Sequence, residues 1–281
     1  MFKEEVLKTP YGQIAFRRSV NTDKPKLLAL HGWLDNCASF ELIAPHLQNH
    51  DWVALDLPGH GLSEHKPPGT FYYLIESLPL LDFLLSALGW KECSLLGHSM
   101  GGAISTLYAA ARPERIRKMV LLENIGPLTV EASEAPLRTQ KFLDQCARPG
   151  PKKLPVYADW REAWKARNMV SPVSEEPSRP LIERALKPFE NGWTWRSDPR
   201  LTLETPLRLT ESHVLEYLSG IQCPTLGIKA KTGYPFPEAI AKTRARQIKH
   251  FSSIELDGGH HLHIDHPETV GPAIAKFLDA N

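Results

Sequence analysis

The sequence predicts an α/β fold, in which a mostly parallel, doubly wound sheet is flanked by helices. Nearly continuous apolar runs alternate with helical stretches, a pattern typical of parallel strands that are covered on both faces. One of these runs leads through a tight glycine-rich turn into an Ala-rich helix. The expected strands are residues 26–30, 52–57, 93–96, 119–122, 225–228 and 253–256, and the expected helices are residues 71–88, 101–111, 238–249 and 267–278.

One long stretch interrupts this alternation. Residues 127–212 contain no convincing strand, recurrent prolines and four of the seven tryptophans. Such a composition favours short helices and ordered loops over another sheet layer. We therefore predict a helical, Pro/Trp-rich cap at residues 127–212, inserted into a core formed by residues 1–126 and 213–281.

Bulk composition excludes several classes of function. The 33 basic residues are balanced by 32 acidic ones, without a basic run that would follow a nucleic acid backbone. The most apolar stretch, residues 77–90, is too short for a membrane span and contains Asp82. The first residues do not read as a signal peptide, so we expect a cytoplasmic protein. The cysteines are too scattered for a disulfide framework, and we expect no cofactor and no metal.

The turn after residues 93–96 predicts a catalytic nucleophile. It reads Gly97-His98-Ser99-Met100-Gly101-Gly102 and lies between a strand and a helix. This is the context of a nucleophile elbow, in which the serine hydroxyl is held at the carboxyl edge of the sheet. Because the turn is very tight, the residues that flank the serine must be small. Ser99 is therefore the expected nucleophile.

A second turn, after residues 26–30, predicts an oxyanion hole. With a nucleophile elbow of this type, the residue after the serine supplies one backbone N–H and this earlier loop supplies the other. We assign these groups to Met100 and Trp33, where they would meet the charge that develops on a carbonyl oxygen. The side chains of Trp33 and His98 are expected to contact the substrate. His31 is expected to brace the loop.

The general base is expected near the end of the chain. His260 follows a strand and a Gly-Gly turn directly, which directs its ring toward the sheet edge that carries Ser99. The next residues also read as a dinuclear zinc motif, with ligands at His261, His263, Asp265 and His266. Such a site needs further histidine ligands later in the chain, and none follows. We therefore predict a base and not a metal site.

These motifs together resemble the α/β-hydrolase family, and more narrowly its serine hydrolase-like esterases. The resemblance rests on His31-Gly32-Trp33, Asp56-Leu57-Pro58-Gly59-His60-Gly61-Leu62-Ser63, the Ser99 turn and Gly259-His260, and it extends to residues 192–200 of the expected cap. It implies the α/β-hydrolase fold. It also implies that the loop of Asp56 is structural.

The acid of the triad departs from the usual pattern of that family. In most relatives it follows the strand that corresponds to residues 225–228, but Gly233 stands where Asp is expected. Some haloalkane dehalogenases of the superfamily take their acid from the end of the preceding strand, where this chain has Glu123. We therefore prefer Glu123 as the residue that orients the imidazole. Asp257 is the next candidate, although it lies only three residues before His260.

The expected activity is hydrolysis of a small or medium, largely apolar carboxylic ester through an acyl-enzyme on Ser99. The substrate is expected to be a small acyl compound, whereas the oligomeric state stays open. Thioesterase, carbon-carbon bond hydrolase and perhydrolase activities share the same core. A binding protein that has lost its acid is the alternative outside enzymes, because of Gly233. Dehalogenases and epoxide hydrolases of this superfamily need a carboxylate where Ser99 stands.

Overall fold

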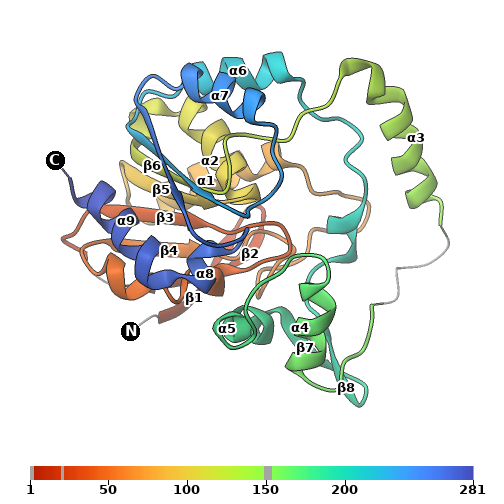
Figure 1. Cartoon of the computed structure of the whole chain (residues 1–281). Helices are drawn as coiled ribbons and strands as arrows, with labels where there is room; N and C mark the ends of the chain where they lie inside the picture. Colours follow the sequence, from red (N-terminus) through yellow and green to blue (C-terminus); the bar gives the residue numbers. More distant parts are fainter. Residues whose placement is uncertain (1–2, 20–21, 149–153, 281) are drawn as a thin grey trace.

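The core of the protein is an eight-stranded, mostly parallel sheet (Figure 1). The computed structural model describes residues 3–19, 22–148 and 154–280. The strands are ordered β1-β2-β4-β3-β5-β6-β9-β10, and only the β1–β2 and β2–β4 pairs are antiparallel. Their bounds are β1 Lys3–Thr9, β2 Gly12–Ser19, β3 Lys26–Leu30, β4 Asp51–Leu55, β5 Cys93–His98, β6 Ile116–Leu122, β9 Thr225–Ala230 and β10 Phe251–Leu256.

The six predicted strands are all present, because each has apolar residues that enter one of two cores on opposite faces of the sheet. In β3, Leu28 and Leu30 face one core, whereas Leu27 and Ala29 face the other. Figure 1 shows α1, α2, α6 and α7 over one face and α8 and α9 over the other. These helices are α1 Ser77–Ala87, α2 Met100–Ala111, α6 Glu211–Ser219, α7 Glu238–Gln247, α8 Leu262–Asp265 and α9 Pro267–Asp279.

The two N-terminal strands were not predicted from the sequence. The β1–β2 hairpin lies at the edge of the sheet, and much of β1 is exposed. β1 is mostly polar, with Val6 and Leu7 as its two apolar residues, so it lacks the continuous apolar run of a strand that is covered on both faces. The four cysteines are free thiols, as expected. Among the described residues, no helix is both long and apolar enough to span a bilayer.

The segment between β6 and α6 leaves the sheet, and its described residues form three α-helices, two short 3-10 helices and a small hairpin (Figure 1). The elements are α3 Ala135–Cys146, α4 Trp160–Asn168, α5 Glu175–Ala185, β7 Leu186–Phe189 and β8 Gly192–Trp195. The prediction that this stretch contains no strand was wrong, since β7 pairs with β8. Pro188 argued against a strand, but proline is tolerated at a sheet edge. The division into core and cap stays a prediction.

Buried polar contacts attach this segment to the sheet. The Arg184 guanidinium of α5 lies 2.7 Å from Asp56, which follows β4 and also accepts hydrogen bonds from the amides of Cys37 and Leu62. Burial alone would raise the pKa of Asp56, but Arg184 and these amides hold it below its ordinary value. The loop of Asp56 is therefore structural, as expected.

Candidate active site

Ser99 sits on a strained turn between β5 and α2. Its φ is 49° and its ψ is −114°, a backbone conformation that L-residues rarely adopt. The flanking glycines permit this turn, since a Cβ on Gly97 would lie 2.6 Å from Gly102 Cα and one on Gly101 would overlap the carbonyl group of Leu30. The local sequence therefore holds the Ser99 side chain at the carboxyl end of the parallel strands.

The ring of His260 lies between Ser99 and Glu123. Its Nε2 is 3.0 Å from Ser99 Oγ, and its Nδ1 is 3.3 Å from Glu123 Oε2. A carboxylate can only accept a hydrogen bond, so this contact assigns the ring proton to Nδ1 and leaves Nε2 free to accept the serine proton. The structure thus brings together three side chains that are far apart in the sequence and that we singled out from it.

Glu123 directly follows β6 and is almost fully buried. Its carboxylate accepts hydrogen bonds from the amides of Ala230 at 2.6 Å and Tyr234 at 2.8 Å, in addition to the contact with His260. Burial alone would raise the pKa of Glu123, but these hydrogen bonds hold it below its ordinary value. Glu123 itself has a φ of 52°, so a second strained residue lies at this site.

Gly233 leaves the space that the Glu123 carboxylate occupies. A Cβ at Gly233 would lie 2.5 Å from Glu123 Cδ and 2.6 Å from Oε1, which is too close for any side chain. The Glu123 carboxylate and a side chain at position 233 thus exclude each other, which explains why this chain has glycine where Asp is expected. Asp257, the other candidate acid, is exposed and forms an ion pair with Lys231 at 2.7 Å instead of contacting His260.

The two residues expected at the oxyanion hole lie in the turns that follow β5 and β3. Met100 is the first residue of α2, where a helix leaves its N–H groups without intrahelical partners. Trp33 lies in the loop after β3, and its half-exposed indole donates a hydrogen bond to the carbonyl oxygen of Leu201 at 2.9 Å. The role of their backbone amides stays a prediction.

His98 does not contact the substrate region, so that prediction needs correction. Its side chain is completely buried, with Nε2 2.9 Å from the carbonyl oxygen of His260 and Nδ1 3.3 Å from Asp35 Oδ2. Burial lowers the pKa of His98 to about 4. The sequence placed His98 beside Ser99, but residues on either side of a turn point in different directions.

Hydrogen bonds show where the other histidines of the sequence analysis lie. His31 braces its loop as expected, because its Nε2 accepts a hydrogen bond from the amide of Leu57 at 3.0 Å and its Nδ1 contacts the carbonyl oxygen of Gly32.

The side chains of the zinc-like motif contact different partners. His261 contacts Asp35 at 3.3 Å, His263 contacts Ser39 at 2.7 Å and Asp265 accepts the amide of Ser174, so this set does not converge on one point.

A cavity of about 710 Å³ opens beside the His260 ring. The core contributes Tyr234 and Pro235 to its walls, and the segment between β6 and α6 contributes Trp164 and Val173. Hydroxyl and carboxylate groups, such as that of Asp265, make the rest of the lining more polar. The sequence did not predict this cavity, because its two walls are more than 50 residues apart in the chain.

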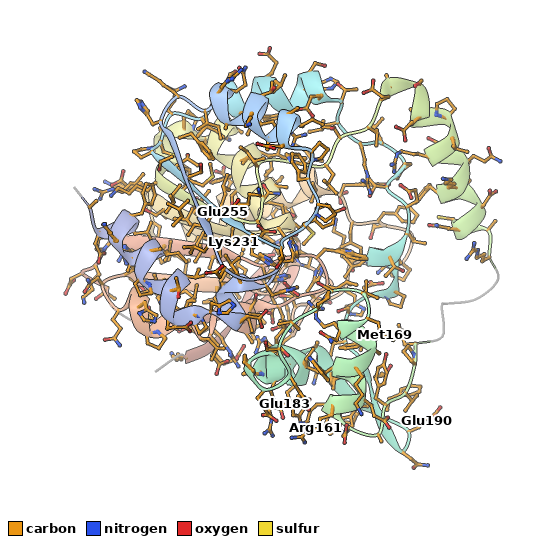
Figure 2. All side chains as sticks on the ribbon, viewed as in Figure 1. Arg161, Met169, Glu183, Glu190, Lys231 and Glu255 are labelled. Carbon is orange, nitrogen blue, oxygen red and sulfur yellow. The ribbon has the colours of Figure 1, made fainter. Side chains whose placement is uncertain are left out.

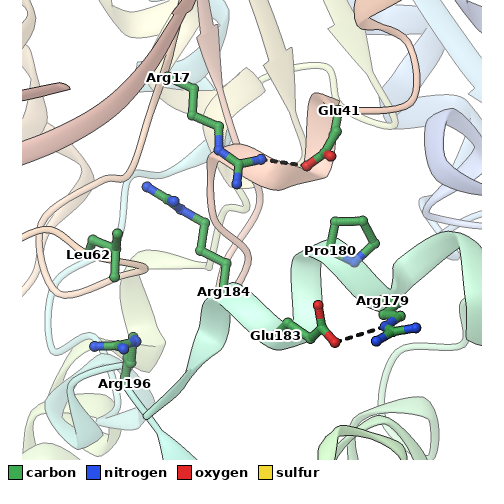
Figure 3. A pocket seen from close by; sticks show the side chains of 8 residues that line it. All are labelled: Arg17, Glu41, Leu62, Arg179, Pro180, Glu183, Arg184 and Arg196. Carbon is green, nitrogen blue, oxygen red and sulfur yellow. Dashed lines mark hydrogen bonds and ion pairs between the residues drawn. The ribbon is translucent and has the colours of Figure 1, made fainter. Parts of the chain in front are cut away.

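A second cavity, of about 450 Å³, lies between β2 and α5 (Figure 3). Four arginines line it, and three of them are paired with carboxylates, including Arg17 with Glu41 and Arg179 with Glu183. None of the residues that surround Ser99 lines this cavity. We therefore assign it a structural role at the junction of α5 with the sheet.

Comparison with known proteins agrees with this fold. The family model described as the alpha/beta hydrolase fold matches residues 25–267. The chain belongs to the α/β-hydrolase family. A serine hydrolase-like protein of Danio rerio is 32% identical over 90% of this chain and 81% of its own length. The protein is therefore a serine hydrolase-like member of the α/β-hydrolases.

Solved structures of this family superpose closely on the protein. A hypothetical protein, PA1622, from Pseudomonas aeruginosa PAO1 has a TM-score of 0.92 and 38% identity, with 99% of this chain and 100% of that chain covered. A thioesterase domain from the curacin biosynthetic pathway has a TM-score of 0.84 and 28% identity, with coverage of 98% and 99%. A thioesterase domain is thus among the structural neighbours of this chain.

Proposed function

We propose that this α/β-hydrolase is a serine esterase that cleaves small to medium, largely apolar carboxylic esters. The observation that supports this most strongly is the hydrogen-bonded series of Ser99, His260 and Glu123, with the serine oxygen 3.0 Å from the imidazole. A nucleophile within hydrogen-bond reach of a base, which a third group orients, is the arrangement that acyl transfer needs.

In the proposed reaction, His260 Nε2 takes the proton of Ser99 as Oγ attacks the ester carbonyl carbon. The amides of Trp33 and Met100 stabilise the oxyanion, and Glu123 stabilises the imidazolium that forms. The intermediate collapses as His260 gives its proton to the departing alcohol, which leaves an acyl-enzyme. Water then attacks the acyl group with His260 as base, and the acid and Ser99 are released.

The cavity beside His260 supports an uncharged substrate. Its apolar walls at Trp164, Val173, Tyr234 and Pro235 suit an acyl or alcohol chain, and the hydroxyls among them suit a polar ester group. Among the residues that the structure describes, no arginine or lysine lines this cavity, so a substrate with phosphate groups would lack a partner for its charge there.

The direct test compares wild type with Ser99→Ala on p-nitrophenyl esters of increasing acyl length. We expect the variant to lose turnover by about 10⁴-fold or more, because the covalent step has no other nucleophile. Labelling with a fluorophosphonate probe separates an enzyme from a binding protein that keeps the fold. Prompt modification of Ser99 supports the enzyme, and equal hydrolysis rates for the two proteins would refute the proposal.

Thioester hydrolysis is the second candidate, because the curacin thioesterase domain is 28% identical to this chain over nearly its whole length. The same nucleophile and base serve both reactions. A panel of matched oxygen esters, thioesters and vinylogous diketones, with a perhydrolysis assay, would rank these activities. A kcat/KM that is higher for the thioester than for the matched ester would transfer the assignment to a thioesterase.

A further inference from the structure

A buried cluster of hydrogen-bond acceptors lies directly behind His260. Asp35 Oδ2 is 3.3 Å from His98 Nδ1 and 3.3 Å from His261 Nε2, and at most 3% of each of these side chains is exposed. The carbonyl oxygen of His260 can only accept, so His98 donates to it through Nε2. The neutral ring therefore presents the lone pair of Nδ1 to the carboxylate. Nδ1 is buried and makes no hydrogen bond of good geometry.

The cation that this cluster requires comes from the segment between β6 and α6. Arg167 of α4 forms an ion pair with Asp35 Oδ1 through Nη2, and the same nitrogen lies 3.3 Å from His261 Nε2. Its Nη1 donates to the carbonyl oxygen of Leu34 at 3.2 Å. Burial alone would raise the pKa of Asp35, but the positive charge of Arg167 holds it well below its usual range. The buried carboxylate is therefore ionised, and the guanidinium is its counter-charge.

This cluster touches both parts of the catalytic arrangement. Through His98 it holds the main chain of His260, the proposed base. Through Asp35 and Leu34 it holds the loop that carries the proposed oxyanion residue Trp33, and Leu34 has a φ of 60°, so that loop is strained. Arg167 of α4 donates to Asp35 and Leu34, although it is 132 residues away from Asp35 in the chain, whereas His98 itself donates to His260. Docking of α4 and alignment of the site are thus physically linked.

We propose that Arg167 is a positioning residue for catalysis, whose guanidinium aligns both His260 and the Trp33 loop through the acceptor cluster of Asp35, His98 and His261. The proposal rests on the serine hydrolase function proposed above. Arg167 does not line the cavity beside His260, so it acts through other residues and not on the substrate.

The test is Arg167→Ala, compared with Arg161→Ala on the same helix. Arg161 lies on the outward side of α4 (Figure 2), where it pairs with Glu175 and Glu176. We expect Arg167→Ala to lower kcat by about 10- to 100-fold with little change in KM, because misalignment acts on the reaction more than on substrate binding. Arg161→Ala is expected to keep the wild-type kcat.

Chemical rescue distinguishes positioning from a merely structural role. A few millimolar guanidinium or methylguanidinium chloride is expected to restore part of the kcat of Arg167→Ala, since the ion can occupy the vacated place beside Asp35. The same concentration of sodium chloride is expected to have no effect. Wild type is expected to show no gain with either salt. Fluorophosphonate labelling of Ser99 should slow and recover in parallel.

Several outcomes would overturn the proposal. These are an unchanged kcat in Arg167→Ala, a change in KM alone, or a folded variant whose lost activity no guanidinium compound restores. If Arg167→Ala fails to fold, Arg167→Lys takes its place. It keeps the charge but not the two-pronged geometry, and a wild-type kcat in that variant would equally refute the proposal. Failure of the esterase proposal is recognised separately, because wild-type Ser99 would then not react with the probe.

Discussion

Gly233→Ala is the sharpest test of the unusual acid, because one methyl group meets the carboxylate directly. The added Cβ would lie 2.5 Å from Glu123 Cδ. Carbon atoms pack at about 3.5 Å or more, so the carboxyl group must move by about 1 Å. Its contact with His260 Nδ1 is already 3.3 Å long, so a shift of this size away from the ring would break it. The same shift would disrupt its hydrogen bonds with the amides of Ala230 and Tyr234.

The expected loss of kcat is the loss that follows when the imidazole has no carboxylate to orient it. Loss of this group lowers kcat by about 10²- to 10⁴-fold in serine hydrolases, which corresponds to about 2.7–5.5 kcal/mol of transition-state stabilisation. KM should change by less than kcat, because Gly233 contributes only a small part of the cavity wall.

The assay is steady-state hydrolysis of a p-nitrophenyl ester, with the melting temperature measured alongside. Gly259→Ala is the matched control. It lies next to His260, but its added Cβ meets nothing closer than the carbonyl oxygen of Thr232 at 3.8 Å, so activity should be nearly normal. A folded Gly233→Ala variant with the same kcat as this control would refute the reasoning, because the loop would then have moved instead of Glu123.

Three further predictions concern carboxylates. Glu123→Gln should lower kcat by about 10²-fold or more, whereas the exposed Asp257→Asn should not, and the reverse result in the same assay would reassign the acid. Arg184→Met should destabilise the fold by about 3–5 kcal/mol in urea unfolding, since it leaves Asp56 buried without its counter-charge; an unchanged midpoint would contradict this. The folded-state pKa of Asp56 is lowered, so its contribution to stability is present above about pH 4 and is lost on further acidification. Unfolding of wild type at several pH values measures this loss, and Asp56→Asn should lack it.

The sequence predicted those parts of the fold in which residues close together in the chain determine the secondary structure. Parallel strands buried on both faces need continuous apolar runs, and these are visible in β3, β5 and β6. The edge strand β1 is mostly polar, and its neighbour β2 has an apolar run of only three residues, 14–16. The hairpin of β7 and β8 had one, since Asn191-Gly192 between aromatic residues is a turn pattern, but our interpretation of this stretch rested on its prolines and tryptophans and did not use it.

The candidate site was predictable to the extent that its residues lie in recognisable turns. Ser99 and His260 each follow a strand and are flanked by glycines, so their motifs locate them. Glu123 was chosen through a family resemblance, because a single acid at a strand end has no local signature. The cluster of Asp35 and Arg167 was beyond sequence reasoning, since it depends on a contact between residues 132 positions apart.

The position of the acid on β6 has a consequence for the loop after β9. The last residue of β9, Ala230, and Tyr234 in the loop after it support Glu123 through their main-chain amides, and every residue except proline offers such a group. The half-exposed ring of Tyr234 lies 5.7 Å from the His260 ring and lines the cavity. The hydrogen bond to the carboxylate comes from the main chain of Tyr234, so it does not depend on this side chain. Substrate preference can diversify at position 234 while the proton-handling residues stay fixed, which makes this loop the natural place to alter selectivity by mutagenesis.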